Sequence, residues 1–352
     1  MKNVISRYIF LITLIIVTYF LYIFPFEILN KYIFKEETSL IISVINTIFF
    51  YLLIIYYLKS YTTFKPLKLF VYEGLGIGFI SFIVIIVSIT INYFGYFEET
   101  SIGISSLILI IIITLYGIFK AKSISIRNIT IDTSKIDKDY NIIFFSDAHL
   151  GTNSPKHIQK IFKSIENIKY DFILIGGDLI DSSSFKLENL KLFNLIKKKI
   201  YFVNGNHEYY LRGYKDKIKE LTKYNIQVLK NKNQKIGKIN LIGIDDLELP
   251  INKISYVNNL KKDKLFNIVI SHKPDIWDSL KDKIDLMLSG HTHNGQIFPF
   301  NFVVKLKFKY IYGLYKSNFS NLYVSSGSGC WGPRLRIGSS NEIVSFRLKK
   351  VN

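Results

Sequence analysis

Four long runs without a charged residue dominate the first third of the chain. They cover residues 8–26, 39–58, 74–97 and 101–119, and short charged connections separate them. An α-helix of about 20 apolar residues spans the roughly 30 Å hydrocarbon core of a bilayer. The pattern therefore predicts four transmembrane helices in a membrane domain of residues 1–119. The first run is long and no small-residue cleavage site follows it, which argues against a cleaved signal peptide.

Basic residues flank these runs unevenly, and this predicts their orientation. Lysine and arginine precede the first run, fill the connection between the second and third, and follow the fourth, at Lys2, Arg7, Lys59, Lys65, Lys68, Lys120, Lys122 and Arg127. In the other two connections glutamate outnumbers or replaces lysine. Because segments rich in lysine and arginine stay in the cytoplasm, we expect a multi-pass protein of the cell membrane with both termini in the cytoplasm.

The remainder, residues 120–352, alternates short apolar runs with stretches typical of helices. Each apolar run ends in a polar loop, and the runs lie at residues 141–145, 172–175, 200–203, 239–244, 266–270 and 284–288. Helices are expected between several of them, at residues 157–168, 187–198 and 214–223. Apolar strands flanked by helices are typical of sheets buried on both faces. The pattern predicts one α/β domain, in which ligands bind beyond the strand ends.

Most of the histidines lie where the predicted strands end, together with two aspartates and one asparagine. This set is Asp147, His149, Asp178, Asn206, His207, His272, His291 and His293. Imidazole, carboxylate and amide ligands without a thiolate suit divalent Mn, Fe or Zn better than a structural zinc site. One carboxylate, which we expect to be Asp178, can bridge two cations that clamp a phosphoryl displacement. Only His157 lies outside the set, near a helix start, where we expect a solvated side chain.

The order of these residues along the chain adds to their chemistry. They form the motifs Asp147-Ala148-His149, Gly177-Asp178, Gly205-Asn206-His207-Glu208, His272 and Gly290-His291-Thr292-His293. In this order the motifs resemble those of the calcineurin-like metallophosphoesterase superfamily, and in particular its bacterial, membrane-anchored branch. The resemblance covers most of residues 125–350. It implies a four-layer α/β/β/α sandwich for residues 120–352.

The resemblance also implies a role for each residue of the motifs. Two divalent metal ions would be bound, one by Asp147, His149, Asp178 and His293, and the other by Asp178, Asn206, His272 and His291. His207 would be the catalytic residue that stabilises the transferring phosphoryl group or protonates the leaving oxygen, since imidazole titrates near neutral pH. Two cations also lower the pKa of bound water toward 7, so no serine or cysteine nucleophile is required.

We therefore expect a membrane-bound metallophosphoesterase, with manganese among the suitable metals, that hydrolyses a phosphoester or pyrophosphate bond. The short connection to the fourth run favours a lipid-linked phosphate such as a phospholipid, and some members of the family cleave UDP-diacylglucosamine. Two alternatives stay open: a non-catalytic metal-binding scaffold or sensor, and a nucleotide or nucleic-acid phosphodiesterase. The net charge of +19 lies almost entirely after residue 119, where an anionic leaflet is a simpler partner than nucleic acid.

Three further features have open interpretations. Residues 302–312 alternate lysine with apolar residues, which fits an amphipathic edge strand or a surface that lies against acidic lipid. Asp245 and Asp246 end a predicted strand, either as partners that orient metal-bound histidines or as turn caps. Arg334 and Arg336 could bind a substrate phosphate with paired hydrogen bonds, or form surface salt bridges.

Overall fold

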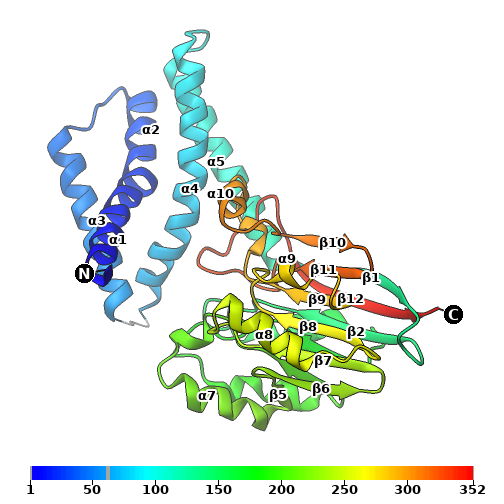
Figure 1. Cartoon of the computed structure of the whole chain (residues 1–352). Helices are drawn as coiled ribbons and strands as arrows, with labels where there is room; N and C mark the ends of the chain where they lie inside the picture. The colour runs from blue at the N-terminus through cyan, green and yellow to red at the C-terminus, as the bar shows by residue number, and fades with distance from the viewer. Residues whose placement is uncertain (1, 61–63, 352) are drawn as a thin grey trace. The chain divides into compact units, whose positions relative to one another are not determined.

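The computed structural model describes residues 2–60 and 64–351, which belong to two compact units (Figure 1). One unit comprises residues 1–119 and 332–335, and the other comprises residues 120–331 and 336–352. The first unit is helical: α1 (Lys2–Thr18), α2 (Phe24–Phe34), α3 (Leu40–Ser60) and α4 (Lys65–Tyr93) are followed by α5 (Glu99–Lys122), which leads into the second unit.

Four helical segments are long and apolar enough to cross a membrane, as the charge-free runs predict. They are Ser6–Phe34, Leu40–Lys59, Pro66–Tyr93 and Glu99–Lys122. The first extends further than expected because α1 continues into α2 through a π-helical turn, η1 (Tyr19–Ile23), and Pro25 lies in the first turn of α2. Pro25 has no N–H to bond to the turn before it, and a proline within a continuous helical segment disturbs the helix there, which fits the π-helical turn.

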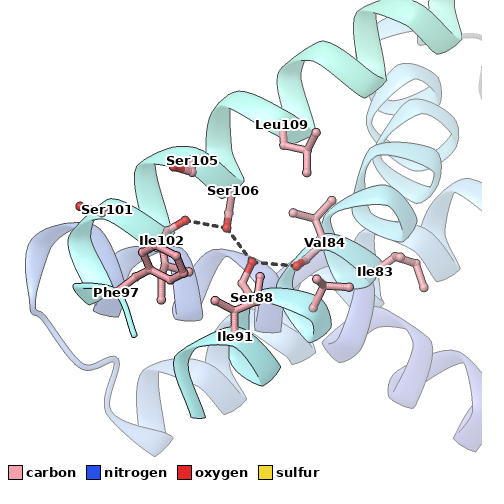
Figure 2. A pocket seen from close by; sticks show the side chains of 11 residues that line it. Ile83, Val84, Ser88, Ile91, Phe97, Ser101, Ile102, Ser105, Ser106 and Leu109 are labelled. Carbon is pink, nitrogen blue, oxygen red and sulfur yellow. Dashed lines mark hydrogen bonds between the residues drawn. The ribbon is translucent and has the colours of Figure 1, made fainter. Parts of the chain in front are cut away.

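Figure 2 shows how α4 and α5 meet around a pair of serines. Ser88 Oγ and Ser106 Oγ lie 2.6 Å apart, and the two hydroxyls also bond to the carbonyls of Val84 and Ile102 at 2.8 and 2.7 Å. A cavity of about 360 Å³, lined mainly by apolar side chains, surrounds the pair. Small hydroxyl residues that bond across two apolar helices are typical of helix contacts in membranes.

The strands in the described part of the second unit form two six-stranded sheets. In the first sheet the order is β1 (Ile124–Thr133), β12 (Asn341–Lys350), β2 (Tyr140–Phe145), β3 (Phe172–Ile175), β4 (Lys199–Phe202) and β5 (Ile226–Val228). Strands β2 to β5 are parallel, and β12 is antiparallel to β2. The run of parallel strands brings their carboxyl ends to one edge of the sheet.

The second sheet repeats this arrangement with different edge strands. Its order is β10 (Gly313–Ser317), β11 (Ser320–Val324), β9 (Leu286–Ser289), β8 (Phe266–Ser271), β7 (Ile239–Ile244) and β6 (Lys232–Ile236). The four central strands are parallel, and β10 and β6 pair antiparallel at the edges.

Alternate side chains of each strand enter different layers, as the pleat of a strand requires. Phe144 and Leu174 of the first sheet pack between the sheets against residues of the second sheet such as Leu241. Their neighbours Ile143 and Phe145 face α6 (Lys156–Ile165), α7 (Tyr214–Glu220) and the 3-10 helix η2 (Leu187–Leu195). On the other side, α8 (Pro250–Leu260) and α9 (Trp277–Leu280) cover the second sheet. The predicted four-layer α/β/β/α sandwich is confirmed.

Three local predictions are corrected by the structure. Residues 187–198 were expected as an α-helix but contain the 3-10 helix η2. The edge strand expected within residues 302–312 is wrong, because β10 occupies that edge of the sheet and the segment instead contributes to α10 (Phe300–Lys307). His157 is buried rather than solvated, and its Nε2 lies 2.8 Å from the Ser328 carbonyl oxygen.

Candidate metal centre

The polar residues singled out in the sequence gather at the carboxyl ends of five parallel strands. Asp147 and His149 follow β2, Asp178 follows β3, and the remaining members follow β4, β8 and β9, namely Asn206, His207, His272, His291 and His293. Because parallel strands end at the same edge of a sheet, residues far apart in sequence are brought together here.

The backbone at these strand ends is unusual. Asp147, His149, Asp178, His291 and His293 all have positive φ values, between 45° and 71°. Aspartate and histidine tolerate this left-handed region better than most residues, and such backbone persists where the surrounding structure fixes it. The sharp turns allow two residues that are only two positions apart, such as His291 and His293, to contribute to different sides of the centre.

Two glycines show how tightly the strand ends approach one another. A Cβ atom at Gly290 would collide with the carboxylate of Asp147, and a Cβ atom at Gly205 would collide with that of Asp178. These positions therefore require glycine for lack of space, since neither has a positive φ.

The first cluster consists of Asp147, His149 and His293, whose ligand atoms lie within 4.8 Å of one another. The Nε2 atoms of the two histidines are 3.0 Å apart, and they lie 3.8 and 3.5 Å from Asp147 Oδ1. Asp147 and His149 are fully buried. Nitrogen and oxygen atoms that converge in this way can hold a divalent cation.

The second cluster consists of Asp178, His272 and His291. His272 Nε2 lies 3.1 Å from Asp178 Oδ2 and 3.2 Å from His291 Nδ1. The same Asp178 oxygen is 3.8 Å from His149 Nε2 of the first cluster. Asp178 is therefore close to both clusters, as expected of a carboxylate that bridges two cations.

Asn206 and His207 complete the set predicted from the sequence. Asn206 Oδ1 is buried and has no hydrogen-bond partner among the described residues, which suits an amide oxygen that ligates a cation. His207 Nε2 lies 3.9 Å from Asp178 Oδ2, and its ring meets that of His149 edge-on. His207 also satisfies the geometry of a ligand group with His149 and Asp178.

Comparison with known proteins establishes the family. The family model for calcineurin-like phosphoesterases matches residues 140–295. An uncharacterized metallophosphoesterase of Helicobacter pylori is 35% identical over 83% of this chain and 85% of its own length. The chain belongs to the calcineurin-like metallophosphoesterases. An uncharacterized metallophosphoesterase of Campylobacter jejuni is also 35% identical, over 69% of both chains.

A metallophosphoesterase relative from Danio rerio bears on the helical unit. It is named a transmembrane protein with metallophosphoesterase domain and is 29% identical over 73% of this chain and 64% of its own length. Together with the four apolar helices, this relative indicates that the present chain is a membrane protein.

In this metallophosphoesterase, burial and neighbouring charges shift the pKa values of the second cluster. Burial alone would raise the pKa of the Asp178 carboxyl, but the adjacent His272 holds it well below its usual range. Burial alone would likewise lower the pKa of His272, yet Asp178 raises it to about 10. Since each group favours the charged form of the other, the pair concentrates charge at the point where the two clusters meet.

The first cluster is held by two charged side chains, Asp181, which the sequence did not single out, and Arg336, which was considered there only for another role. His149 Nδ1 faces Asp181 Oδ2 at 3.3 Å, and this carboxylate raises the pKa of His149 against the opposite effect of burial. His293 Nδ1 faces Arg336 Nη2 at 3.2 Å. Burial, with His149 and Arg336 adding to it, holds the pKa of His293 well below its usual range. The two histidines of one cluster thus have partners of opposite charge.

Backbone groups and Glu208 support the second cluster. His272 Nδ1 donates to the Gly176 carbonyl at 2.8 Å, which turns Nε2 toward Asp178. The Glu208 carboxylate accepts from the backbone N–H groups of Asp178, Ile180 and Gly205 at 2.7–3.0 Å, although burial raises its pKa to about 7. Glu208 belongs to the quoted motif, so its position next to His207 was the signal that could have identified it.

Two hypotheses about other polar residues are wrong. Asp245 accepts hydrogen bonds from Asn204 and Tyr209, and Asp246 pairs with Lys253 and Lys273, so neither orients a histidine of the clusters. Arg336 is fully buried, and its guanidinium donates to the carbonyls of His293, Ser326 and Gly329. A guanidinium committed to these acceptors is not available to a substrate phosphate. Arg334 forms the other interaction considered, a salt bridge, with its Nε 2.6 Å from Glu73 Oε1; its contact with a substrate phosphate stays a prediction.

Proposed function

We propose that this membrane protein is a two-metal hydrolase of phosphoester or pyrophosphate bonds. One divalent cation would be bound by Asp147, His149, Asp178 and His293, and the other by Asp178, Asn206, His272 and His291. The observation that carries the proposal is the position of Asp178, whose Oδ2 lies 3.8 Å from His149 Nε2 and 3.1 Å from His272 Nε2. One carboxylate that faces two histidine clusters supports a pair of cations rather than a single one.

The donor atoms fit such cations. Nitrogen and oxygen donors without a thiolate suit Mn, Fe or Zn, and the buried Asn206 Oδ1 lacks a hydrogen-bond donor among the described residues. An amide oxygen adds a ligand without placing another negative charge next to a phosphate. When bound, two cations lower the pKa of water and stabilise charge on the attacking and leaving oxygens.

His207 is the proposed catalytic residue. Its backbone N–H donates to Asp178 Oδ1 at 2.8 Å, which fixes the residue beside the clusters. Burial lowers the pKa of the ring to about 4, so the neutral ring can donate an N–H hydrogen bond to a phosphoryl or leaving oxygen at neutral pH. This interaction strengthens as negative charge develops on that oxygen.

Substitution of His207 tests this role. We expect His207→Ala to retain two Mn ions per chain while kcat falls about 10²–10³-fold, the usual effect of removing one hydrogen-bond donor to a transition state. The loss should be smaller for p-nitrophenyl phosphodiesters than for phenyl phosphodiesters, because a good leaving group needs less stabilisation. His157→Ala is the matched control, since His157 lies outside both clusters. If His207→Ala instead loses Mn, this histidine is a ligand.

A lipid-linked phosphate, such as a phospholipid or UDP-diacylglucosamine, is the proposed substrate class. Exposed aromatic rings next to the clusters support it: Tyr210 and Trp331 lie 5.3 and 5.6 Å from the ring of His207. Such rings can contact the apolar part of a lipid. The test compares the hydrolysis of five compounds: the two lipids, p-nitrophenyl phosphate, bis-p-nitrophenyl phosphate and an oligonucleotide. If the protein binds two metals but hydrolyses none of these compounds, it is better described as a non-catalytic scaffold. If it cleaves the oligonucleotide in a salt-dependent way, a nucleic-acid phosphodiesterase is favoured.

The orientation in the membrane is also a proposal. The distribution of lysine and arginine around the apolar segments supports a phosphoesterase domain in the cytoplasm. A reporter at the C-terminus that is active only outside the cytoplasm should stay inactive, and an active reporter would contradict this orientation.

A further inference from the structure

An exposed apolar patch accompanies the helix α10. It consists of Phe298, Phe302, Val303 and Leu306, whose exposed fractions are 54, 57, 53 and 89%. Phe302 and Leu306 are four positions apart on α10, so they lie on one face of the helix. None of the described residues of α10 is buried. A group of large apolar side chains at one place on the surface marks an interaction site more often than scattered single residues do.

Two lysines belong to the same short helix. Lys305 and Lys307 are exposed, and neither has a carboxylate partner among the described residues. Lys305 Nζ lies 6.0 Å from the Phe302 ring centre, and Lys307 Nζ 5.6 Å from that of Phe308. The α10 patch therefore combines apolar side chains with free positive charge within a few residues.

The patch is attached directly to the metal centre. The turn that carries His291 and His293 continues into α10, and the His291 ring lies edge-on to Phe308 at 5.1 Å. Thr292 Oγ1, between the two histidines, donates to the Ile311 carbonyl at 2.5 Å. The chain connection holds the start of the helix segment, and these two contacts hold its end, to the loop of the second sheet that contributes to both clusters. A surface that binds α10 is thereby brought close to the metal centre.

We propose that the α10 patch inserts into the headgroup region of an anionic phospholipid bilayer. Interfacial helices combine apolar side chains, often phenylalanine and leucine, with lysine on the polar side, and lysine stems can bury their carbons while the ammonium stays at the headgroups. The same chain has four helices that are long and apolar enough to cross a bilayer. Only Ser123 separates the last of them, α5, from β1. This inference does not depend on the reaction or on the substrate.

The composition of the patch distinguishes a bilayer from a protein partner. Lysine is depleted in protein interfaces, whereas anionic lipid attracts it. Two unpaired lysines beside four exposed apolar residues thus complement a phospholipid surface better than a second copy of the chain.

An environment-sensitive fluorophore on α10 tests the proposal in the full chain. Leu306→Cys would be labelled with a nitrobenzoxadiazole probe and reconstituted, one chain per nanodisc, in phosphatidylcholine with or without phosphatidylglycerol. The native Cys330 is buried, and labelling of the wild-type chain gives its background. We expect blue-shifted and several-fold brighter emission with phosphatidylglycerol, reduced at about 1 M salt, where the Debye length is ~3 Å. Lys305→Gln with Lys307→Gln should remove the dependence on phosphatidylglycerol.

Leu195→Cys is the matched control, because Leu195 is a leucine of similar exposure, 76%, in η2. Its probe should report water in both lipid compositions. Emission at position 306 equal to that at position 195 would overturn the proposal. A blue shift that appears only in liposomes with many chains, and not in nanodiscs, would also overturn it and identify a second copy as the partner.

Discussion

The two clusters of the metal centre have similar donors but different supports. In the first, side chains of opposite charge face the outer nitrogens of the histidines: Asp181 lies 3.3 Å from His149 Nδ1, and Arg336 lies 3.2 Å from His293 Nδ1. In the second, His272 Nδ1 donates to the backbone carbonyl of Gly176 at 2.8 Å. The histidines of the first cluster are thus oriented by side chains, and His272 of the second is oriented by the main chain.

This difference decides what can be changed without touching a proposed ligand. A side-chain partner can be altered or removed by substitution, whereas a backbone carbonyl remains with any residue. Substitution of a group that orients a ligating histidine typically lowers metal affinity about 10–100-fold. We therefore expect the first cluster to be the one whose cation affinity is adjustable, and the second to be the more invariant.

The largest effect is expected where the two clusters meet. Asp178→Asn replaces the carboxylate that faces both, so both cations should be lost and turnover should fall about 10³-fold or more, at least the effect of losing one electrostatic contact to a transition state. Metal content by mass spectrometry and hydrolysis of bis-p-nitrophenyl phosphate would measure this. Asp263→Asn, at an exposed residue whose side chain retains 86% exposure, is the matched control. If the Asp178→Asn variant retains two cations, Asp178 is not the carboxylate that bridges them.

Substitutions of two glycines should distinguish the two clusters by the number of Mn ions bound, with a smaller effect than Asp178→Asn. Gly290→Ala places a methyl group against the carboxylate of Asp147, which belongs to the first cluster alone. We expect the variant to bind one Mn ion per chain instead of two. Gly205→Ala places the methyl group against Asp178 instead, so it should lose both ions. Equal stoichiometry in the two variants would contradict the division into clusters.

Gly213→Ala serves as control for both glycine variants. No atom lies within 4 Å of the added carbon, although φ is +64° at this position. The substitution should lower stability by about 1–2 kcal/mol through the left-handed backbone and leave metal binding intact. Unfolding followed by circular dichroism would separate this loss of stability from a loss of metal.

A still smaller change concerns the side chain behind His149. Asp181→Asn removes the charge that faces Nδ1 but keeps the size of the side chain, so the His149 ring should be oriented less firmly. We expect Mn affinity of the first cluster to fall about 10–100-fold, measured by titration calorimetry, while the second site binds as in the wild type. An equal decrease at both sites would mean that Asp181 acts on the fold rather than on one cluster.

The comparison of the clusters also shows what the sequence could reveal. Asp147, Asp178 and His272 were predictable because each follows an apolar run, and parallel strands must end at a common edge. The family motifs then assigned each residue a role, and the four-layer sandwich followed from the same resemblance. The apolar helices were predictable from length and charge alone, except that the first continues beyond residue 26 to Phe34.

The supports were harder to predict, for physical reasons. A backbone carbonyl such as that of Gly176 has no signature in the sequence. Arg336 lies 43 residues after His293, and only the folded chain places its guanidinium behind the ring. The segment at residues 302–312 was misread because alternation of lysine and apolar residues over a few positions fits a short helix as well as a strand.

Arg336 provides the smallest expected effect on catalysis and a larger one on stability. Arg336→Lys keeps the charge but loses the planar donors that reach the carbonyls of Ser326 and Gly329. Loss of one hydrogen bond to a charged group costs about 1.5–3 kcal/mol, and the thermal midpoint should fall by about 2–4 °C per kcal/mol. The control is Arg347→Lys, whose exposed pair with Asp139 contributes little. Because the positive charge stays behind His293, Mn affinity should change less than tenfold. A larger loss of affinity would show that the direction of the guanidinium, and not its charge, orients the first cluster.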